Sequence, residues 1–234
     1  MTYILLVAGK GSRLHPLTLN TPKSLYKLDK NDTVLQRMIS LIKKVDENAE
    51  IIVVTGFLAI QIKENINGVT FINNPFYSVT NSIASLWFAR KYLLRDNVTI
   101  INGDIVMEEA LIKNEVCNPT EIPYILLDSS VKHNGDYNVQ INQDKVLVMS
   151  KDLDSYYGEY AGVTKLDINS AKLLYDEINK MVMNEMYDQW YENALVQMIF
   201  NYDFQLFYRD ISMYQWTEID CVEDLLLAKK IHME

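Results

Sequence analysis

The residues best suited to chemistry form a glycine-rich, basic stretch that directly follows the first apolar run of the chain. This stretch reads Ala8-Gly9-Lys10-Gly11-Ser12-Arg13-Leu14-His15-Pro16-Leu17-Thr18. Gly9 and Gly11 allow the backbone to approach a phosphate chain closely and to present N–H groups to its oxygens. The stretch therefore predicts a loop that binds phosphate.

The charge of the first 28 residues supports an anion site. They contain no Asp or Glu, although the whole chain carries a formal net charge of −9. Their basic side chains are Lys10, Arg13, Lys23 and Lys27. A cationic segment beside a glycine-rich turn favours anion capture, and a solvated loop with scattered bases is the alternative. Two familiar phosphate-binding motifs do not fit the sequence. A dinucleotide-binding fingerprint requires a small residue at the position of Leu14, and a Walker A loop requires glycine at the position of Pro22.

Two aspartates follow expected strands. Asp104 comes after the apolar run 98–102, and Asp220 comes after the run 214–219. Open α/β sheets bind ligands at the carboxyl ends of their strands, and Mg²⁺ prefers one or two carboxylates together with phosphate oxygens. The residues alone leave open whether Asp104 merely forms a turn with Gly103 and whether Asp220 caps the final helix.

The elements that must position these residues are visible in the hydrophobic pattern of the first half. Short runs rich in Ile and Val alternate with segments of helical period, which is typical of a parallel sheet covered on both faces. The expected strands are 3–7, 51–55, 70–72 and 98–102. The expected helices are 34–45 with Thr33 as its N-cap, 58–66 and 82–93. This half is therefore predicted to be doubly wound.

The second half predicts a mixed edge of the same sheet. Its expected strands are 124–127, 137–141, 146–149 and 214–219, and its expected helices are 168–183, 190–200 and 222–231. Because no linker or internal repeat divides the chain, we expect one α/β domain over 1–234. Its mixed, mostly parallel sheet is flanked by helices, with the glycine-rich basic stretch in a first half at 1–107 and the looser pattern in a second half at 108–234.

Composition excludes several classes of function. The net charge of −9 and the pI near 4.9 argue against binding to nucleic acid or to anionic membranes, which requires a basic surface. The opening run 3–8 is too short for a signal-peptide core, and no run reaches the roughly 18 apolar residues of a membrane span. The two cysteines, Cys117 and Cys221, lack metal-ligand spacing. We expect a cytoplasmic protein with reduced thiols.

A family resemblance rests on the glycine-rich stretch. Leu6 to Thr18, together with Pro22-Lys23-Ser24-Leu25, resembles the signature of the nucleotidyltransferases that make nucleotide-activated sugars and alcohols. Within that superfamily, the short chain and three further segments resemble the phosphocholine and aminoethylphosphonate cytidylyltransferases. These segments are Asn81-Ser82-Ile83-Ala84-Ser85-Leu86, Asn102-Gly103-Asp104 and Trp216-Thr217-Glu218-Ile219-Asp220. The resemblance spans most of the chain and implies a Rossmann-like, GT-A-like nucleotidyltransferase fold.

The resemblance also implies a reaction and its residues. A phosphate or phosphonate oxygen of a small phosphorylated or phosphonylated amine attacks the α-phosphorus of CTP, and pyrophosphate leaves. A phosphate monoester has a second pKa near ~6, so no general base is needed and charge neutralisation dominates. Lys23 and Arg13 are the expected catalytic cations, and Asp104 and Asp220 are the expected Mg²⁺ ligands. The nucleotide is expected to contact Ala8, Gly9, Gly11, Ser12, Arg13, Asn81, Ser85 and Asp104, with Asn81 equally suited to capping a helix.

The acceptor is expected to contact an aromatic and acidic set of residues in the second half. Its members are Tyr157, Glu159, Tyr160, Trp190 and Glu192. Aromatic faces attract an ammonium group by cation–π interaction, and a carboxylate adds charge complementarity. The alternative is that these rings are ordinary core material. The resemblance further implies that the product decorates a cell-surface polysaccharide.

Two other functions stay open. One is a sugar-1-phosphate nucleotidyltransferase that uses dTTP or UTP, and the other is a regulatory domain that binds nucleotide without catalysis. The compact chain favours CTP, since the hexose-1-phosphate enzymes usually carry larger inserts. The methionines of the late helices suit an irregular core or a homodimer seam better than a cofactor site.

Overall fold

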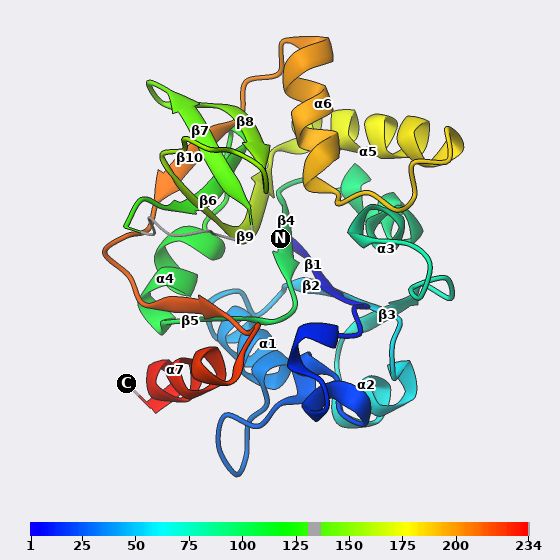
Figure 1. Cartoon of the computed structure of the whole chain (residues 1–234), viewed down its shortest axis with the longest axis vertical. Coiled ribbons are helices and arrows are strands. Elements are labelled where there is room, and N and C mark those ends of the chain that lie inside the picture. The colour runs from blue at the N-terminus through cyan, green and yellow to red at the C-terminus, as the bar shows by residue number, and fades with distance from the viewer. Residues whose placement is uncertain (131–136, 234) are drawn as a thin grey trace.

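The computed structural model describes residues 1–130 and 137–233. Within them, nine strands form one sheet in the order β3-β2-β1-β4-β9-β6-β10-β8-β7 (Figure 1). The strands are β1 (Thr2–Val7), β2 (Glu50–Thr55), β3 (Thr70–Asn73), β4 (Val98–Asn102), β6 (Tyr124–Asp128), β7 (Asn138–Asn142), β8 (Lys145–Ser150), β9 (Gly158–Leu166) and β10 (Phe207–Asp210). A small second sheet pairs β5 (Ile105–Met107) antiparallel with β11 (Trp216–Glu218).

Helices cover both faces of the large sheet (Figure 1). One face packs against α1 (Val34–Val45), α2 (Ala59–Asn65) and α4 (Glu109–Leu111). The other face packs against α3 (Ser82–Phe88), α5 (Ile168–Met183) and α6 (Glu192–Tyr202). Successive side chains of a strand point to opposite faces, so a strand covered on both sides is apolar throughout. In β1, Tyr3 and Leu5 accordingly pack on the α1 side and Ile4 packs on the α3 side.

The predicted α/β architecture is confirmed. Strands β1, β2, β3 and β4 are mutually parallel, and the later strands add antiparallel pairings to the same sheet. Helix α1 has the predicted bounds, and Thr33 caps it in a reciprocal capping box with Gln36. Helix α5 also has its predicted bounds, whereas the predicted helix 82–93 ends at Phe88 and is followed by the 3₁₀ turn Arg90–Leu94.

The sequence pattern did not predict strand β9. Residues 158–162, which include the predicted acceptor residues Glu159 and Tyr160, belong to this strand. Strand β9 lies antiparallel between β4 and β6, in the middle of the sheet. Its residues are buried almost throughout, with Tyr160 only 3% exposed. The aromatic and acidic segment that contains Glu159 and Tyr160 is therefore sheet core rather than a binding loop.

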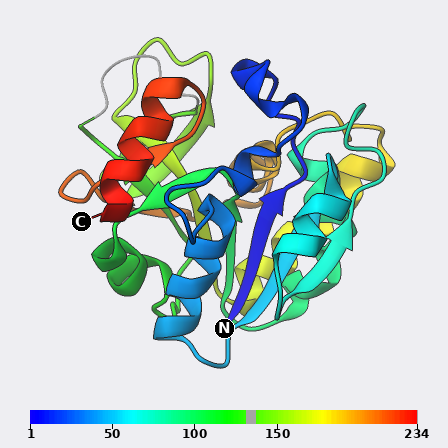
Figure 2. The same cartoon turned by 90° about the horizontal axis from the view of Figure 1, so that it is seen from below.

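The C-terminal helix α7 (Val222–Met233) packs against the N-terminal segment (Figures 1 and 2). The buried cluster that joins them consists of Leu14, Leu28, Val34, Val106, Ile219, Ala228 and Ile231. This packing and the pairing of β5 with β11 bring Asp220 beside Lys23. No helix among the described residues combines the length and apolar character that a membrane span requires.

Candidate active site

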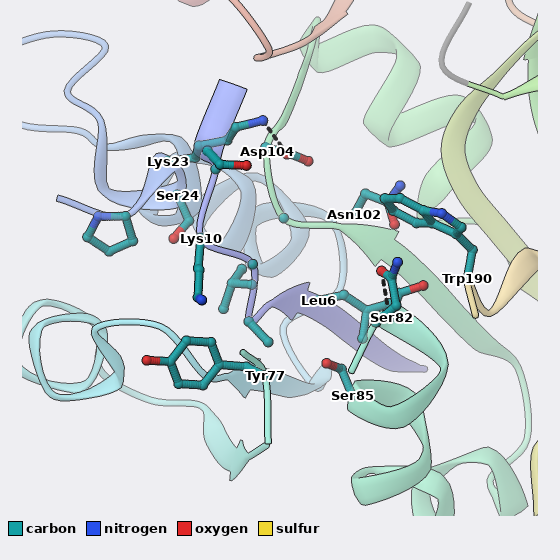
Figure 3. Close-up of a pocket in the computed structure, with 18 of the residues that line it drawn as sticks. Leu6, Lys10, Lys23, Ser24, Tyr77, Ser82, Ser85, Asn102, Asp104 and Trp190 are labelled. Carbon is teal, nitrogen blue, oxygen red and sulfur yellow. Dashed lines mark hydrogen bonds and ion pairs between the residues drawn. The ribbon is translucent and has the colours of Figure 1, made fainter. Parts of the chain in front are cut away.

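A cavity of about 530 Å³ opens where β1 and β4 end. Its wall combines the glycine-rich turn after β1, the residues that lead into α3, and the segment Asn102–Asp104 after β4. Figure 3 shows Lys23 and Asp104 on one side of it and Asn102 and Trp190 on the other. The ligand site of an open α/β sheet is expected at this end of the strands. The eight residues predicted to contact a nucleotide all line this cavity: Ala8, Gly9, Gly11, Ser12, Arg13, Asn81, Ser85 and Asp104.

Lys23 lies between the two predicted carboxylates. Its Nζ donates to Asp220 Oδ1 at 2.5 Å and to Asp104 Oδ2 at 3.3 Å, while Arg13 Nη1 lies 3.0 Å from Asp220 Oδ2. Burial by itself lowers the pKa of Lys23, but the two carboxylates outweigh burial and hold that pKa above its ordinary value. Lys23 is therefore a permanent cation at neutral pH.

Local structure places each of these three charged groups. Lys23 lies in the 3₁₀ turn Lys23–Leu25 and is buried. The N–H of Gly103 donates to Leu6 O at 2.9 Å, which fixes the segment before Asp104 to the end of β1. The N–H groups of residues 220 and 221 both donate to Asp224. Because Asp224 bonds these amides at the start of α7, the Asp220 carboxylate is left to pair with Lys23 and Arg13.

A third carboxylate joins the cluster. Oxygens of Asp104, Glu218 and Asp220 lie within 4.8 Å of one another, close enough for one cation to contact all three. Carboxylate oxygens are hard donors that suit Mg²⁺. Glu218 was not among the predicted metal ligands. The sequence does contain a signal for Glu218. Glu218 and Asp220 are two residues apart at the end of a strand, and residues with that spacing share a face.

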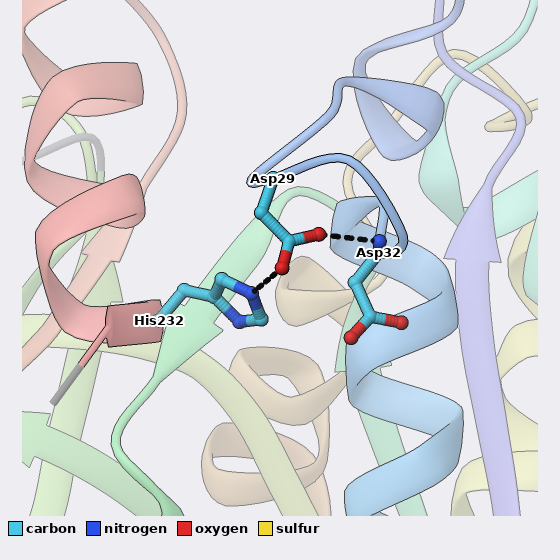
Figure 4. Close-up of side chains that lie close together, drawn as sticks. All are labelled: Asp29, Asp32 and His232. Carbon is cyan, nitrogen blue, oxygen red and sulfur yellow. Dashed lines mark hydrogen bonds and ion pairs between the residues drawn. The ribbon is translucent and has the colours of Figure 1, made fainter.

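A second group with metal-like spacing lies outside this cavity. Asp29, Asp32 and His232 approach one another between the loop before α1 and the C-terminal helix (Figure 4). The N–H of Asp32 donates to Asp29 Oδ1 at 2.7 Å, and His232 Nε2 lies 3.1 Å from Asp29 Oδ2. The bond from the Asp32 backbone is the largest cause that lowers the pKa of Asp29 to about 2. Asp29 thus ties its own turn to α7.

The two glycines of the basic turn have different local roles. Gly11 has φ +62°, and a Cβ there would lie 2.8 Å from Lys23 Cγ. Only glycine adopts this conformation without strain, so Gly11 allows the turn to pack closely on Lys23. Gly9 has no heavy atom within 4 Å of the position of a Cβ. Its backbone therefore borders open space in the cavity.

The opposite wall is polar and aromatic. The side chain of Asn81 accepts the N–H of Ser82 at 2.8 Å, which is the capping role anticipated as an alternative, and Asn81 also lines the cavity. Ser85 is buried and accepts from Asn74 Nδ2 at 3.0 Å. Tyr77 was not predicted, and Lys10 Nζ lies 5.9 Å from the centre of its ring (Figure 3). No periodic pattern marks Tyr77, since it lies in the loop between β3 and α3.

A comparison with known protein families decides the identity of this region. Residues 2–116 match the family model described as nucleotidyl transferase. They include the glycine-rich turn, Lys23 and Asp104. This part of the chain belongs to the nucleotidyl transferase family.

Individual relatives extend the likeness to the whole chain. The choline-phosphate cytidylyltransferase of Streptococcus pneumoniae is 27% identical over 99% of this chain and 98% of its own. The CTP:phosphoglutamine cytidylyltransferase of Campylobacter jejuni is 31% identical over 138 residues, which are 56% of this chain and 53% of the relative. Among solved structures, the CTP:phosphocholine cytidylyltransferase of Streptococcus pneumoniae has a TM-score of 0.81 at 24% identity, covering 99% of this chain and 98% of that one. The inositol-1-phosphate CTP transferase of T. maritima has a TM-score of 0.77 at 20% identity, covering 98% and 95%. These structures share the α/β nucleotidyltransferase fold.

The predicted acceptor residues do not all line the cavity. Trp190 lines the cavity, but Tyr157, Glu159, Tyr160 and Glu192 do not belong to its lining. Tyr160 is in the core, where its hydroxyl bonds those of Thr164 and Tyr191. The ring of Tyr157 packs on Tyr208, with centroids 5.7 Å apart. The alternative that these rings are core material therefore holds for Tyr160, whereas Tyr157 is exposed.

Glu192 is a buried carboxylate behind the cavity wall. It is 3% exposed, and its Oε2 has no hydrogen-bond partner among the described residues. Burial raises the pKa of Glu192 to about 7, with Lys151 and Asn102 acting in the opposite direction. Glu192 is not part of the cavity lining, so its predicted contact with the acceptor stays a prediction that the cavity wall does not support.

Proposed function

We propose that this chain is a Mg²⁺-dependent cytidylyltransferase that transfers the CMP part of CTP to a small phosphorylated or phosphonylated substrate and releases pyrophosphate. The observation that carries the proposal is the meeting of Lys23, Asp104 and Asp220 beside the open backbone of Gly9. This arrangement supplies both signs of charge that a bound metal triphosphate requires. The relatives named above support CTP as the nucleotide, since those two cytidylyltransferases match this chain at 27% and 31% identity.

The reaction needs no nucleophile from the protein. An oxygen of the substrate phosphate forms a bond to the α-phosphorus of CTP, and the bond from that phosphorus to the bridging oxygen of pyrophosphate breaks. The leaving pyrophosphate keeps the electron pair. Lys23 and Arg13 bind the phosphates and offset the negative charge as two polyanions approach, and the cavity orients them. A substrate that is already an oxyanion at neutral pH needs no base from the protein.

The three carboxylates fit a divalent cation. Asp104, Glu218 and Asp220 would hold Mg²⁺, which when bound neutralises phosphate charge. Lys23 and Arg13 pair with two of these carboxylates in this structure. They must therefore give up these partners when metal and triphosphate bind together. The triphosphate oxygens are the partners that replace the carboxylates.

The remaining cavity residues suit the nucleoside. Tyr77 and Lys10 offer a ring face and a donor, while Asn81 and Ser85 offer polar contacts on the wall formed by α3. We place the base of CTP against this wall and the substrate at the end of the cavity near Asn102 and Trp190. The use of the product in decorating a cell-surface polysaccharide stays a prediction from the family resemblance.

A screen of pyrophosphate release tests this proposal. CTP, UTP and dTTP are each combined with phosphocholine, 2-aminoethylphosphonate, O-phosphoserine and hexose 1-phosphates, in the presence of Mg²⁺. We expect release with CTP and a small non-sugar substrate. Release only with UTP or dTTP and a hexose phosphate would favour the sugar-nucleotide alternative. Binding of triphosphate without any release would favour a regulatory domain.

A further inference from the structure

Three polar side chains on the α3 wall of the cavity accept hydrogen bonds from the protein itself. Asn81 Oδ1 accepts the N–H of Ser82, and Ser82 Oγ accepts the N–H of Tyr191, both at 2.8 Å. Ser85 Oγ accepts from Asn74 Nδ2 at 3.0 Å. Asn81, Ser82 and Ser85 all line the cavity, and Figure 3 shows the two serines on this wall. Within residues 1–130 and 137–233, the hydroxyl protons of both serines and the Asn81 amide protons have no acceptor, so this wall offers donors to a ligand.

The direction of the bond to Ser85 is fixed by the surroundings of Asn74. Asn74 is fully buried and does not line the cavity. Its Oδ1 accepts the N–H of Phe76 at 2.9 Å, so its Nδ2 faces Thr80 and Ser85. Thr80 donates its own hydroxyl proton to Phe76 O at 2.9 Å, and it therefore accepts from Asn74. Because Asn74 is the donor in this network, Ser85 cannot give its proton to Asn74.

Ser85 is the most buried of the three donors on this wall. It is 4% exposed, whereas Asn81 and Ser82 are partly exposed. A buried hydroxyl proton without an acceptor costs free energy, and a ligand that supplies the acceptor recovers it. Ser85 therefore favours a ligand with an acceptor atom at this depth and disfavours a ligand that carries a hydrogen there.

The pyrimidine bases differ at the atoms that such a wall can contact. On cytosine, O2 and N3 are neighbouring acceptors and the N4 amino group is a donor. On uracil and thymine, N3 carries a hydrogen and lies between two acceptors, O2 and O4. O2 is close to the ribose, and N3 is further from it. A base that enters with its ribose toward the cavity opening therefore brings N3 to the most buried donor.

We propose that Asn74 is a positioning residue that holds Ser85 as a hydrogen-bond donor to N3 of cytosine, and that this contact distinguishes CTP from UTP and dTTP. The inference rests on the proposed cytidylyltransferase function and assigns the residues that choose its base. The partly exposed donors of Asn81 and Ser82 face O2, which all three bases carry. The contact at N3 determines the choice, because the hydrogen on N3 of uracil or thymine would meet the Ser85 proton.

Replacement of a single atom of the nucleotide tests this contact. 3-Deaza-CTP has C–H in place of N3 and keeps O2 and the N4 amino group. The binding of CTP and of 3-deaza-CTP is measured by calorimetry on the full chain with Mg²⁺ and without a phosphorylated substrate. We expect CTP to bind the unmodified protein at least ~10-fold more tightly, because 3-deaza-CTP leaves the Ser85 donor buried without a partner. Equal affinities for the two nucleotides would overturn the inference.

Substitutions show whether Ser85 and Asn74 cause this preference. Ser85→Ala removes the donor and should reduce the preference for CTP to within about threefold, through weaker binding of CTP. Asn74→Asp keeps the shape of the side chain but replaces the Nδ2 donor with an acceptor, to which Ser85 would donate, so the preference should fall by a similar factor. Asn73→Asp is the matched control, because Asn73 is the exposed neighbour outside the cavity lining. It should leave the preference unchanged.

The variants also define the results that contradict the inference. A preference for CTP that survives Ser85→Ala or a folded Asn74→Asp would overturn it, and so would a preference that Asn73→Asp also abolishes. Circular dichroism establishes whether Asn74→Asp is folded, and Ser85→Ala decides the result if it is not.

Pyrophosphate release separates this inference from the proposed function. Binding that depends on N3 and on Ser85, without release from any substrate, would refute the cytidylyltransferase activity and leave the assignment of Ser85 and Asn74 intact. Release from CTP by a chain that binds 3-deaza-CTP equally well would refute that assignment and support the activity.

Discussion

At the scale of single residues, the central feature is one ammonium group held between two carboxylates. Lys23 pairs with both Asp104 and Asp220, and Arg13 adds a second contact to Asp220. A metal ion would need the same carboxylate oxygens. Metal binding and the release of Lys23 are therefore coupled, and the triphosphate that attracts Lys23 should promote metal binding.

Replacement of Lys23 should separate catalysis from metal affinity. Lys23→Met should lower turnover by at least ~10²-fold, because a cation that stabilises the transition state is commonly worth ~3 kcal/mol. The same change should strengthen the binding of Mn²⁺ in the absence of nucleotide, measured by calorimetry. Lys27→Met, in the same basic segment but outside the cavity lining, is the control. If Lys23→Met left turnover undiminished or Mn²⁺ affinity unchanged, Lys23 would not be the cation that stabilises the transition state and competes with the metal.

Glu218 provides an independent test of the metal site. Glu218→Gln, Asp104→Asn and Asp220→Asn should each raise the Mg²⁺ concentration for half-maximal activity by about 10-fold or more, because each removes a charged donor. Glu223→Gln changes an exposed residue of α7 and should leave this Mg²⁺ concentration unchanged. A Mg²⁺ titration that is the same for Glu218→Gln and the unmodified chain would exclude Glu218 as a ligand.

The pKa of Glu192 predicts a pH-dependent stability. Its ordinary value of 4.5 is raised to about 7 in the folded chain, so the folded state binds its proton more tightly than the unfolded state does. The free energy of unfolding should therefore fall as pH rises from 4.5 to 7 and stay constant above, by up to about 3 kcal/mol from this group. Glu192→Gln should abolish this contribution in urea unfolding measured between pH 5 and 8. A difference between the two proteins that does not change with pH would contradict the prediction.

At the scale of elements, the glycine-rich turn combines a structural glycine with one that serves ligand access. Gly11→Ala should lower the free energy of unfolding by about 1–2 kcal/mol, because φ is +62° and Lys23 is in contact. Gly9→Ala should stay within about 0.5 kcal/mol, since its Cβ would enter open space. It should still weaken CTP binding, because that space is where phosphate is proposed. Equal destabilisation by the two changes, or normal CTP affinity of Gly9→Ala, would contradict this division.

The sequence predicted elements with a clear period and missed those without one. Strands β1, β2 and β4 are mainly apolar and buried, and α1 and α5 have apolar stripes at helical spacing, so their positions followed directly. β9 contains Gly158, Gly162 and the buried Lys165, which conceal a strand. Lys165 is accommodated because its Nζ donates to Val116 O at 2.6 Å and to Thr99 Oγ1 at 3.3 Å. Such long-range partners cannot be inferred from local composition.

The same reasoning applies to the site. Lys23, Asp104 and the cavity-lining glycines were identified because a compact motif carries them. Four of the five predicted acceptor residues lie outside the cavity lining, since an aromatic and acidic composition does not distinguish a binding surface from a core. Trp190 is the member of that set that lines the cavity, and its neighbour Lys151 follows β8, far away in sequence.

At the scale of the whole molecule, β9 joins the two halves of the sheet. It pairs with β4 of the first half and with β6 of the second, and α7 returns to pack on the N-terminal segment. We propose that residues 1–234 act as one folding unit. Urea unfolding followed by tryptophan fluorescence and by far-UV circular dichroism should give coincident transitions. Two separated transitions would show that the halves unfold independently.

A crystal structure of the chain with a non-hydrolysable CTP analogue and Mn²⁺ tests the central claim most directly. The anomalous signal of Mn²⁺ locates the metal without reference to the other atoms. We predict a peak in contact with the carboxylates of Asp104 and Asp220, and Lys23 Nζ bound to the triphosphate instead of to Asp220. A metal located elsewhere, or a Lys23 that keeps its contact with Asp220 while the nucleotide is bound, would contradict the account.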